Sequence, residues 1–147
     1  MKPEQRVWKR LRSVLQAVPG LKYERVESGV SGNGVPDVYC AQKGRGAFWF
    51  ELKADTTTDA TEIRFPATEN GWRHTQRRWA ADSWARGVPV YLVVGKGPVL
   101  YVMDTREVTD LDRLSIYDKR VHPCSSVIEL CASGTMIEAG KSSSVSK

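Results

Sequence analysis

Two predicted strands joined by a short basic turn constrain the fold of this chain more than any other feature. Residues 35–42 and 47–54 are rich in β-branched and aromatic side chains, and residues 43–46 between them include two glycines. Glycine in a short polar segment between two such runs is typical of a β-hairpin. Pairing the strands across this turn places Asp37 opposite Glu51 to within about one residue, where facing side chains lie about 5 Å apart. The hairpin therefore brings two carboxylates together.

Alternation along the second strand separates an apolar face from a charged one. Successive side chains of a strand point to opposite faces. One face of the strand is expected to enter the core, because it carries three large apolar side chains: Phe48, Phe50 and Leu52. Glu51 and Lys53 share the other face with Trp49, and Asp37 approaches them from the first strand. Two acids and one amine are thus expected in a single small cluster.

The chemistry of such a cluster favours a metal site. Two carboxylates a few ångströms apart repel each other unless a cation lies between them. Mg²⁺ binds oxygen ligands, usually one or two carboxylates together with water and a phosphate oxygen, and Mn²⁺ is expected to substitute for it. A metal held in this way polarises a phosphodiester and activates water, which a neighbouring lysine can orient. The alternative is a solvated ion cluster on an ordinary hairpin, where such pairs contribute about 0–1 kcal/mol.

Val-Pro-Asp at residues 35–37, followed by Glu-Leu-Lys at residues 51–53, resembles the PD-(D/E)xK signature of the restriction-endonuclease-like nucleases. The resemblance covers residues 4–94 and is greatest to small phage and bacterial members related to Holliday-junction resolvases and VRR-NUC nucleases. It implies an α/β fold with an α-β-β-β-α-β core, in which a mixed central sheet is flanked by helices. By this resemblance, the metal is held by the side chains of Asp37 and Glu51 and by the backbone carbonyl of Leu52. Lys53 is the catalytic lysine.

A first helix is predicted at residues 4–18, with an apolar stripe along one side made of Val7, Trp8, Leu11, Val14, Leu15 and Val18. Glu4 lies at the start of this stripe. In the family that the chain resembles, an acid of the first helix often points into the metal site, and Glu4 is the position that could do so. The alternative is that Glu4 only interacts favourably with the positive, N-terminal end of the helix dipole. The other faces carry cations that are candidates for contacts with DNA phosphates: Arg6, Lys9 and Arg10.

A second helix is predicted at residues 70–86, beginning at Asn70 and closed by Gly87. Gln76 lies on its inward stripe. Members of the resembled family commonly carry a glutamine here behind the metal site, which implies a supporting catalytic role; the alternative is a core glutamine satisfied by backbone groups. The outward faces carry the densest basic patch of the chain, expected to bind DNA: Arg73, Arg77 and Arg78. His74 has no histidine partner at metal-ligand spacing, so it is expected to contact phosphate or solvent.

The remaining segments complete the predicted fold. Their boundaries follow from runs of β-forming residues, glycine-containing turns and polar stretches. In chain order they are a strand at 21–27, a flexible connector at 28–34, a long mobile loop at 54–69, strands at 88–94 and 99–103, a short helix at 107–117, a short strand or turn at 127–130, and a disordered tail rich in glycine and serine at 133–147.

Composition favours a single soluble globular domain at residues 1–132. The 147-residue chain is 41% hydrophobic and 27% charged, and it shows neither an apolar run long enough to span a membrane nor a signal-peptide pattern. A net charge of +5 permits binding to nucleic acid. Three cysteines, an odd number without metal-ligand spacing, favour a reducing cytoplasm. The resemblance implies that this is the cytoplasm of a bacterium or of a phage-infected host.

These features predict a divalent-metal-dependent DNA endonuclease. The chain shows no motif for reading base edges, so recognition is expected to depend on DNA shape. The resemblance implies a homodimer that acts on branched DNA, such as four-way junctions, and two-fold dimers are also the commonest oligomers in general. Two alternatives remain. The first is a catalytically inactive DNA-binding or regulatory protein that retains the nuclease fold, and the second is a structural protein whose carboxylates brace a hairpin.

Overall fold

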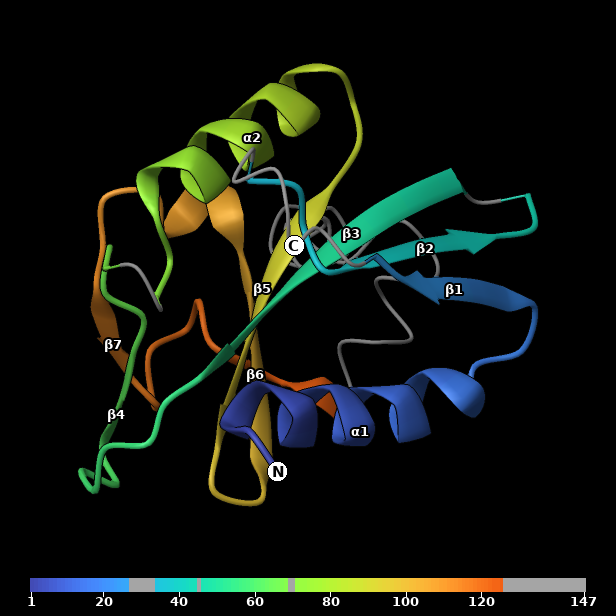
Figure 1. Cartoon of the computed structure of the whole chain (residues 1–147). Helices are drawn as coiled ribbons and strands as arrows, with labels where there is room; N and C mark the ends of the chain where they lie inside the picture. Colours follow the sequence, from blue (N-terminus) through green and yellow to red (C-terminus); the bar gives the residue numbers. More distant parts are fainter. Residues whose placement is uncertain (27–33, 45, 69–70, 126–147) are drawn as a thin grey trace, which may run out of the picture.

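The computed structural model describes residues 1–26, 34–44, 46–68 and 71–125, which form a mixed sheet with a helix on each face (Figure 1). The elements in chain order are α1 (Pro3–Gln16), β1 (Leu21–Arg25), β2 (Val38–Gln42), β3 (Gly46–Ala54), β4 (Glu62–Arg64), α2 (His74–Ala85), β5 (Val90–Lys96), β6 (Val99–Asp104), the 3₁₀ turn η1 (Thr105–Glu107), β7 (Arg113–Ser115) and β8 (His122–Pro123). Apart from the short strand β4, the order up to β5 is the α-β-β-β-α-β order that was predicted. The predicted α/β fold class is confirmed.

The large sheet has six strands in the order β1-β2-β3-β5-β6-β8. The first three strands form an antiparallel meander, and β3 then pairs in parallel with β5. A parallel neighbour needs a crossover connection, and α2 lies within it. β6 returns antiparallel to β5. β3 therefore lies between an antiparallel and a parallel partner in the interior of the sheet, and five of its nine residues are buried.

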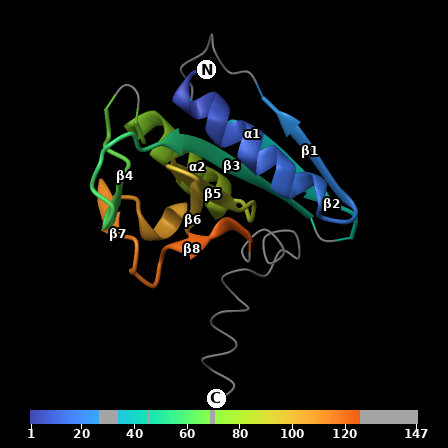
Figure 2. The ribbon, with the colours of Figure 1, turned by 90° about the horizontal axis from the view of Figure 1, so that it is seen from below.

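Each face of the sheet carries its own hydrophobic core (Figures 1 and 2). On one face, α1 buries the stripe that was predicted from its sequence, and Val7, Leu11 and Leu15 pack on Phe50 and Leu52. Cys40 is fully buried in this core, as expected for a cysteine that acts as a small hydrophobe. On the other face, α2 packs over β5 and β6, and the cluster comprises Ile63, Phe65, Trp72, Ala80, Val90, Leu92, Val94, Met103, Val108 and Leu114. Both faces of the central strands are therefore covered.

The prediction of a mobile loop at residues 54–69 is wrong, because β4 lies within it and pairs with β7 in a second, two-stranded sheet. The side chain of Asp55 is 1% exposed, and its carboxylate organises the start of the segment. It accepts hydrogen bonds from the backbone N–H of Thr57 at 2.9 Å, from that of Arg64 at 3.0 Å, and from Lys96 Nζ at 2.9 Å. These three hydrogen bonds hold residues 55–64 against the sheet.

Two other expectations need correction. Residues 107–117 do not form a helix: they continue from the turn η1 into the three-residue strand β7. The second helix begins at His74, so that Trp72 precedes it and is buried. Five predictions lie partly or wholly outside the described residues. They concern Asn70 as the first residue of α2, Arg45 in the hairpin turn, the connector at 28–34 except Gly34, the strand or turn at 127–130, and the tail at 133–147.

Among the residues that the structure describes, no helix combines the length and the apolar character needed to cross a membrane. The longest described helix, α1, has 14 residues and charged side chains on its outer faces.

Candidate active site

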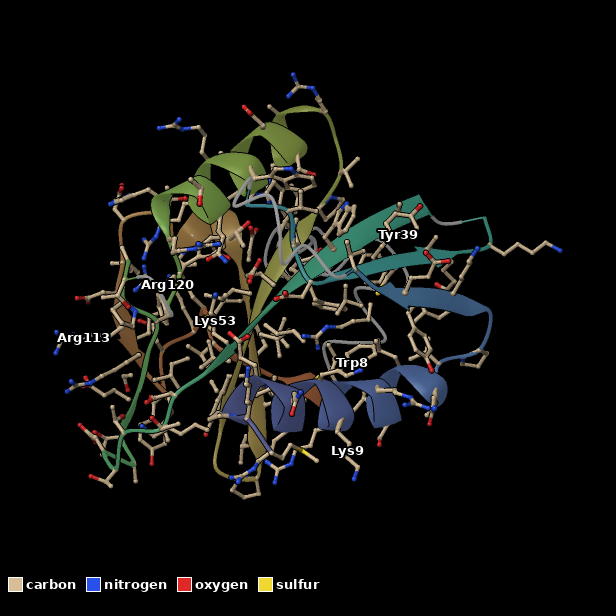
Figure 3. The ribbon with its side chains drawn as sticks, viewed as in Figure 1. Trp8, Lys9, Tyr39, Lys53, Arg113 and Arg120 are labelled. Atoms are coloured by element: carbon tan, nitrogen blue, oxygen red, sulfur yellow. The ribbon has the colours of Figure 1, made fainter. Side chains whose placement is uncertain are left out.

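The hairpin places Asp37 and Glu51 together as the sequence predicted. The ladder between β2 and β3 pairs Val38 with Phe50, and extending this register by one residue sets Asp37 across from Glu51. On its other side, β3 pairs Glu51 with Leu92 of β5. Figure 3 shows Lys53 on β3 where this strand passes between the two helices. Glu51 is 2% exposed and Lys53 6%, so both charged groups are buried in the middle of the fold.

Asp37 is held in place by the backbone of the strand that carries the other two residues. Its Oδ2 accepts a hydrogen bond of 2.8 Å from the N–H of Leu52. The chain enters the hairpin through Gly34, which has a φ of +80° and is packed so closely on α2 that a Cβ would overlap the carbonyl of Thr75. The position of Asp37 is thus fixed from both β3 and α2.

Glu51 is the centre of the site. Its Oε2 lies 3.4 Å from Lys53 Nζ and accepts a hydrogen bond of 3.3 Å from Gln76 Nε2. Its Oε1 is buried and has no hydrogen-bond partner in the described part of the chain. Burial raises the pKa of Glu51 well above the ordinary value of 4.5; the neighbouring Asp37 raises this pKa further, and Lys53 acts in the opposite direction. A buried carboxylate with one oxygen left without a partner favours a bound cation.

Glu4 reaches the same site from the first turn of α1. Its Oε1 lies 3.9 Å from Lys53 Nζ. Burial raises the pKa of Glu4 above 4.5, while the Lys53 ammonium lowers it and Asp37 raises it. The side chain of Glu4 therefore points towards the site, as in the first of the two alternatives given for it. Nevertheless, no group of three or more His, Cys, Asp and Glu side chains among the described residues is arranged to hold a metal ion. The carboxylate donors that the structure brings together are those of Asp37 and Glu51.

Gln76 links α2 to the site through both ends of its amide group. Its Oε1 accepts a hydrogen bond of 2.9 Å from the backbone N–H of Arg73, and its Nε2 donates to Glu51. The side chain is 7% exposed, so this amide is buried and is satisfied by the site itself. One of its two hydrogen bonds is therefore to the backbone and the other to Glu51, and the supporting catalytic role of Gln76 stays a prediction.

The prediction that Arg77 faces outward is wrong. Arg77 is only 9% exposed, and its guanidinium donates to four backbone carbonyls, those of Trp72, Val108, Thr109 and Phe65. The face of α2 that carries it is covered by the segment after β6, which the sequence pattern did not predict to pack there. Arg77 therefore joins three segments of the chain and is not available to DNA.

The other predicted DNA contacts divide between exposed and half-buried positions. Arg78 and His74 are exposed on α2, and Arg73 is half-buried at the start of the helix. The cations of α1 are exposed: Arg6, Lys9 and Arg10. Arg10 donates to the carbonyl of Gly97, and with Arg6 it lines a cavity of about 550 Å³ that extends to Ala54, the residue after Lys53. The basic surface of α1 therefore continues to the edge of the site.

One basic residue near the site was missed from the sequence. Arg25 of β1 stacks on Trp8, with its guanidinium carbon 5.4 Å from the ring centroid, and its charge lowers the pKa of Glu4. Arg25 could have been placed near the site from the pairing of β1 with β2, because this pairing sets Arg25 opposite Val38, the neighbour of Asp37. Without the position of β1 in the sheet, Arg25 is only one cation among many.

Replacement of Gly34 by alanine is expected to destabilise the protein by about 2 kcal/mol or more. A side chain at positive φ costs about 1–2 kcal/mol, and here a Cβ would also overlap the Thr75 carbonyl. Chemical denaturation monitored by tryptophan fluorescence measures the change. Gly44 is the matched control, since it has a φ of +78° but no atom within 4 Å of the position that a Cβ would occupy. Equal losses in Gly34→Ala and Gly44→Ala would show that the contact with α2 contributes nothing.

No family model matches the sequence, and no curated protein matches it. Among solved structures, 21 chains match. One is the structure of Archaeoglobus fulgidus Hjc, a Holliday junction resolvase from an archaeal hyperthermophile. It shares 15% sequence identity with this chain at a TM-score of 0.49, and the match covers 76% of this chain and 83% of that chain.

Proposed function

We propose that this protein is a divalent-metal-dependent DNA endonuclease that hydrolyses phosphodiester bonds. The observation that carries the proposal is the buried cluster on the hairpin, where the carboxylate of Glu51 has one unpartnered oxygen beside Asp37 and Lys53. A cluster that only braced a hairpin would be expected to pair its buried polar atoms. The unpaired oxygen and the raised pKa of Glu51 support a site that is completed by a ligand.

The donor atoms fit a hard cation. Asp37 and Glu51 would hold Mg²⁺, or Mn²⁺ in its place, with the backbone carbonyl of Leu52 as a further oxygen ligand and Glu4 close enough to assist through water. Oxygen donors of this kind are those that Mg²⁺ takes in proteins, with its remaining positions left to water and phosphate. When bound, such an ion polarises the phosphodiester and lowers the pKa of water. The amide of Gln76 would keep the carboxylate of Glu51 in the orientation needed for binding.

Lys53 supplies the positive charge of the protein at the reaction centre. Its ammonium group lies between the carboxylates of Glu51 and Glu4 and is positioned to donate a hydrogen bond to a phosphate oxygen or to the attacking water. During hydrolysis a water oxygen forms a bond to phosphorus, and the bond from phosphorus to the leaving sugar oxygen breaks. The water loses one proton and the leaving oxygen gains one, so that the products are a phosphomonoester and a hydroxyl.

The surface around the site supports DNA as the substrate. Of the predicted DNA contacts on α1 and α2, those that are exposed are Arg6, Lys9, Arg10 and Arg78. They would contact phosphates without reading base sequence, and their contribution would fall as salt concentration rises. We further propose that the protein acts on branched DNA, such as four-way junctions, as a homodimer whose two sites nick opposed strands.

Cleavage is expected only in the presence of Mg²⁺ or Mn²⁺, and four-way junctions are expected to be cut in preference to linear duplex. The experiment incubates the protein with linear, flapped and four-way-junction DNA of the same sequence in Mg²⁺, in Mn²⁺ and in EDTA. Paired nicks on the junction would support the proposal, and sedimentation of the same sample tests for a dimer. An Asp37→Asn variant purified in parallel controls for contaminating nucleases. Full activity in EDTA, or equal activity in Asp37→Asn, would reject the metal-dependent site.

A catalytically inactive DNA-binding protein with this fold is the second candidate. The basic surface of α1 would serve it equally well, whereas the buried cluster of Asp37, Glu51 and Lys53 would have no use in it. Binding of four-way-junction DNA without any cleavage in either metal would favour this alternative.

A further inference from the structure

Arg73 stands apart from the other arginines of the α2 region. It immediately precedes α2 and is half-buried. Its Nε is fully buried and has no hydrogen-bond partner among the described residues. A buried donor without an acceptor is energetically unfavourable. Arg77, four residues later, shows the opposite arrangement, because its guanidinium donates to several backbone carbonyls.

The backbone of Arg73 is fixed relative to the site by two consecutive hydrogen bonds. Its N–H donates to Gln76 Oε1 at 2.9 Å, and Gln76 Nε2 donates to Glu51 Oε2 at 3.3 Å. Arg73 is also near enough to Glu4 for its charge to lower the pKa of that carboxyl group. Arg73 is therefore tied to the site through its backbone and lies within electrostatic range of Glu4, although no carboxylate of the described residues forms an ion pair with it.

A phosphate group would complete this arrangement. The guanidinium presents several N–H donors in a planar fork that matches two oxygens of a phosphate. A positively charged fork that has no ion-pair partner among the described residues, on a backbone linked through Gln76 to Glu51, is suited to the charge that develops on a phosphate oxygen during cleavage. An exposed cation farther along α2, such as Arg78, can only contact DNA that is already bound nearby.

We propose that Arg73 is a catalytic residue that donates hydrogen bonds to the phosphate being cleaved, with stronger bonds to the transition state than to the bound substrate. This inference rests on the proposed nuclease function and assigns a new role within it. Arg73 thereby differs from the exposed arginine of α2, which contributes to affinity alone.

The test compares Arg73→Gln with Arg78→Gln, since both changes remove one positive charge from the same part of the protein. Single-turnover cleavage of four-way-junction DNA is measured over a range of protein concentrations. Arg73→Gln is expected to lower the maximal rate by about 10²- to 10³-fold, with less than roughly a threefold change in apparent affinity. Arg78→Gln should keep the maximal rate and weaken binding. Guanidinium ion added at millimolar concentration should restore part of the rate of Arg73→Ala and leave Arg78→Ala unchanged.

The thermal midpoint of each variant and the activity of Arg73→Lys separate catalysis from folding. Arg73→Lys keeps the charge and loses the fork, so it should recover only part of the rate while unfolding at the parent temperature. An active parent protein with undiminished rate in Arg73→Gln would overturn the role of Arg73 and leave the nuclease proposal intact. Loss of rate that follows a fall in thermal midpoint, without rescue by guanidinium, would assign Arg73 a structural role and also overturn it. A parent protein inactive on every DNA in every metal would overturn the nuclease function itself.

Discussion

A Glu51→Gln variant is expected to cleave DNA about 10²- to 10³-fold more slowly than the parent protein and, in metal-free buffer at neutral pH, to unfold at a higher temperature. The amide keeps the size of the side chain and an oxygen that can accept from Gln76, but it cannot bind a metal as a carboxylate does. Stability should rise because burial and the neighbouring Asp37 oppose the charge on Glu51. A gain of roughly 1 kcal/mol corresponds to about 3 °C or more in thermal midpoint.

The pH dependence of stability has the same origin. The pKa of Glu51 is higher in the folded protein than its ordinary value of 4.5, so the folded state holds the proton more tightly than the unfolded state. The free energy of unfolding of the parent protein should therefore fall as pH rises from about 4.5 towards the pKa of the folded state. Glu51→Gln should remove this part of the dependence, and denaturant titrations at a series of pH values measure it.

Glu24→Gln is the matched control for Glu51→Gln. Glu24 lies on β1, its side chain is 60% exposed, and it pairs with Lys22 at 3.6 Å. An exposed pair of this kind contributes little, so the control should keep both the activity and the thermal midpoint of the parent protein. A Glu51→Gln variant that cleaves at the parent rate would exclude Glu51 from the mechanism. A variant that is inactive because it has lost its fold would contradict the expected gain in stability.

Replacing Arg77 by methionine is expected to destabilise the protein by about 3 kcal/mol or more, with a thermal midpoint lower by roughly 10 °C. Methionine can fill the space of the aliphatic stem, but it leaves several buried carbonyls without a donor. Each hydrogen bond from a charged donor contributes about 1.5–3 kcal/mol. Calorimetric unfolding of the parent and the variant gives the difference.

Arg78→Met is the appropriate comparison, because it makes the same chemical change at an exposed position of α2. It should alter the free energy of unfolding by no more than about 0.5 kcal/mol. If the two variants were equally stable, the contacts of Arg77 with the segment after β6 would have no energetic significance.

The central elements could be predicted from the sequence, because each carries a strong local pattern. The stripe of apolar residues on α1, the alternation along β3 and the glycines of the hairpin turn are contained within short windows. Register then follows from the turn, so the proximity of Asp37 and Glu51 could be predicted from the spacing of the two strands alone. The glutamine of α2 was identified because a polar side chain on an apolar stripe is unusual.

The peripheral elements could not be predicted, because long-range contacts determine them. β4 and β7 have three residues each, and neither has a pattern that distinguishes it from a loop until the two strands pair. The same pairing brings the segment after β6 against α2, and this is what buries Arg77. From the helix alone, Arg77 and Arg78 are equivalent cations. Arg73 and Arg25 were likewise indistinguishable from other basic residues until the sheet and α2 had been placed around Glu4.

The position of β3 determines how the protein can respond to a substrate. The strand pairs with β2 along its first part and with β5 along its second, and Phe50 and Leu52 on either side of Glu51 are buried in one core while Leu92 and Val94 of β5 are buried in the other. A shift of the β3 backbone at Glu51 and Lys53 would therefore disturb both hydrophobic cores. Local openings of this kind cost nearly the full free energy of unfolding. If the proposed function is right, a strand held in this way cannot adapt to the path of a bound polynucleotide. The distortion needed to bring a phosphate to these buried groups would then fall on the nucleic acid, and a flexible or branched strand would be deformed at the lowest cost.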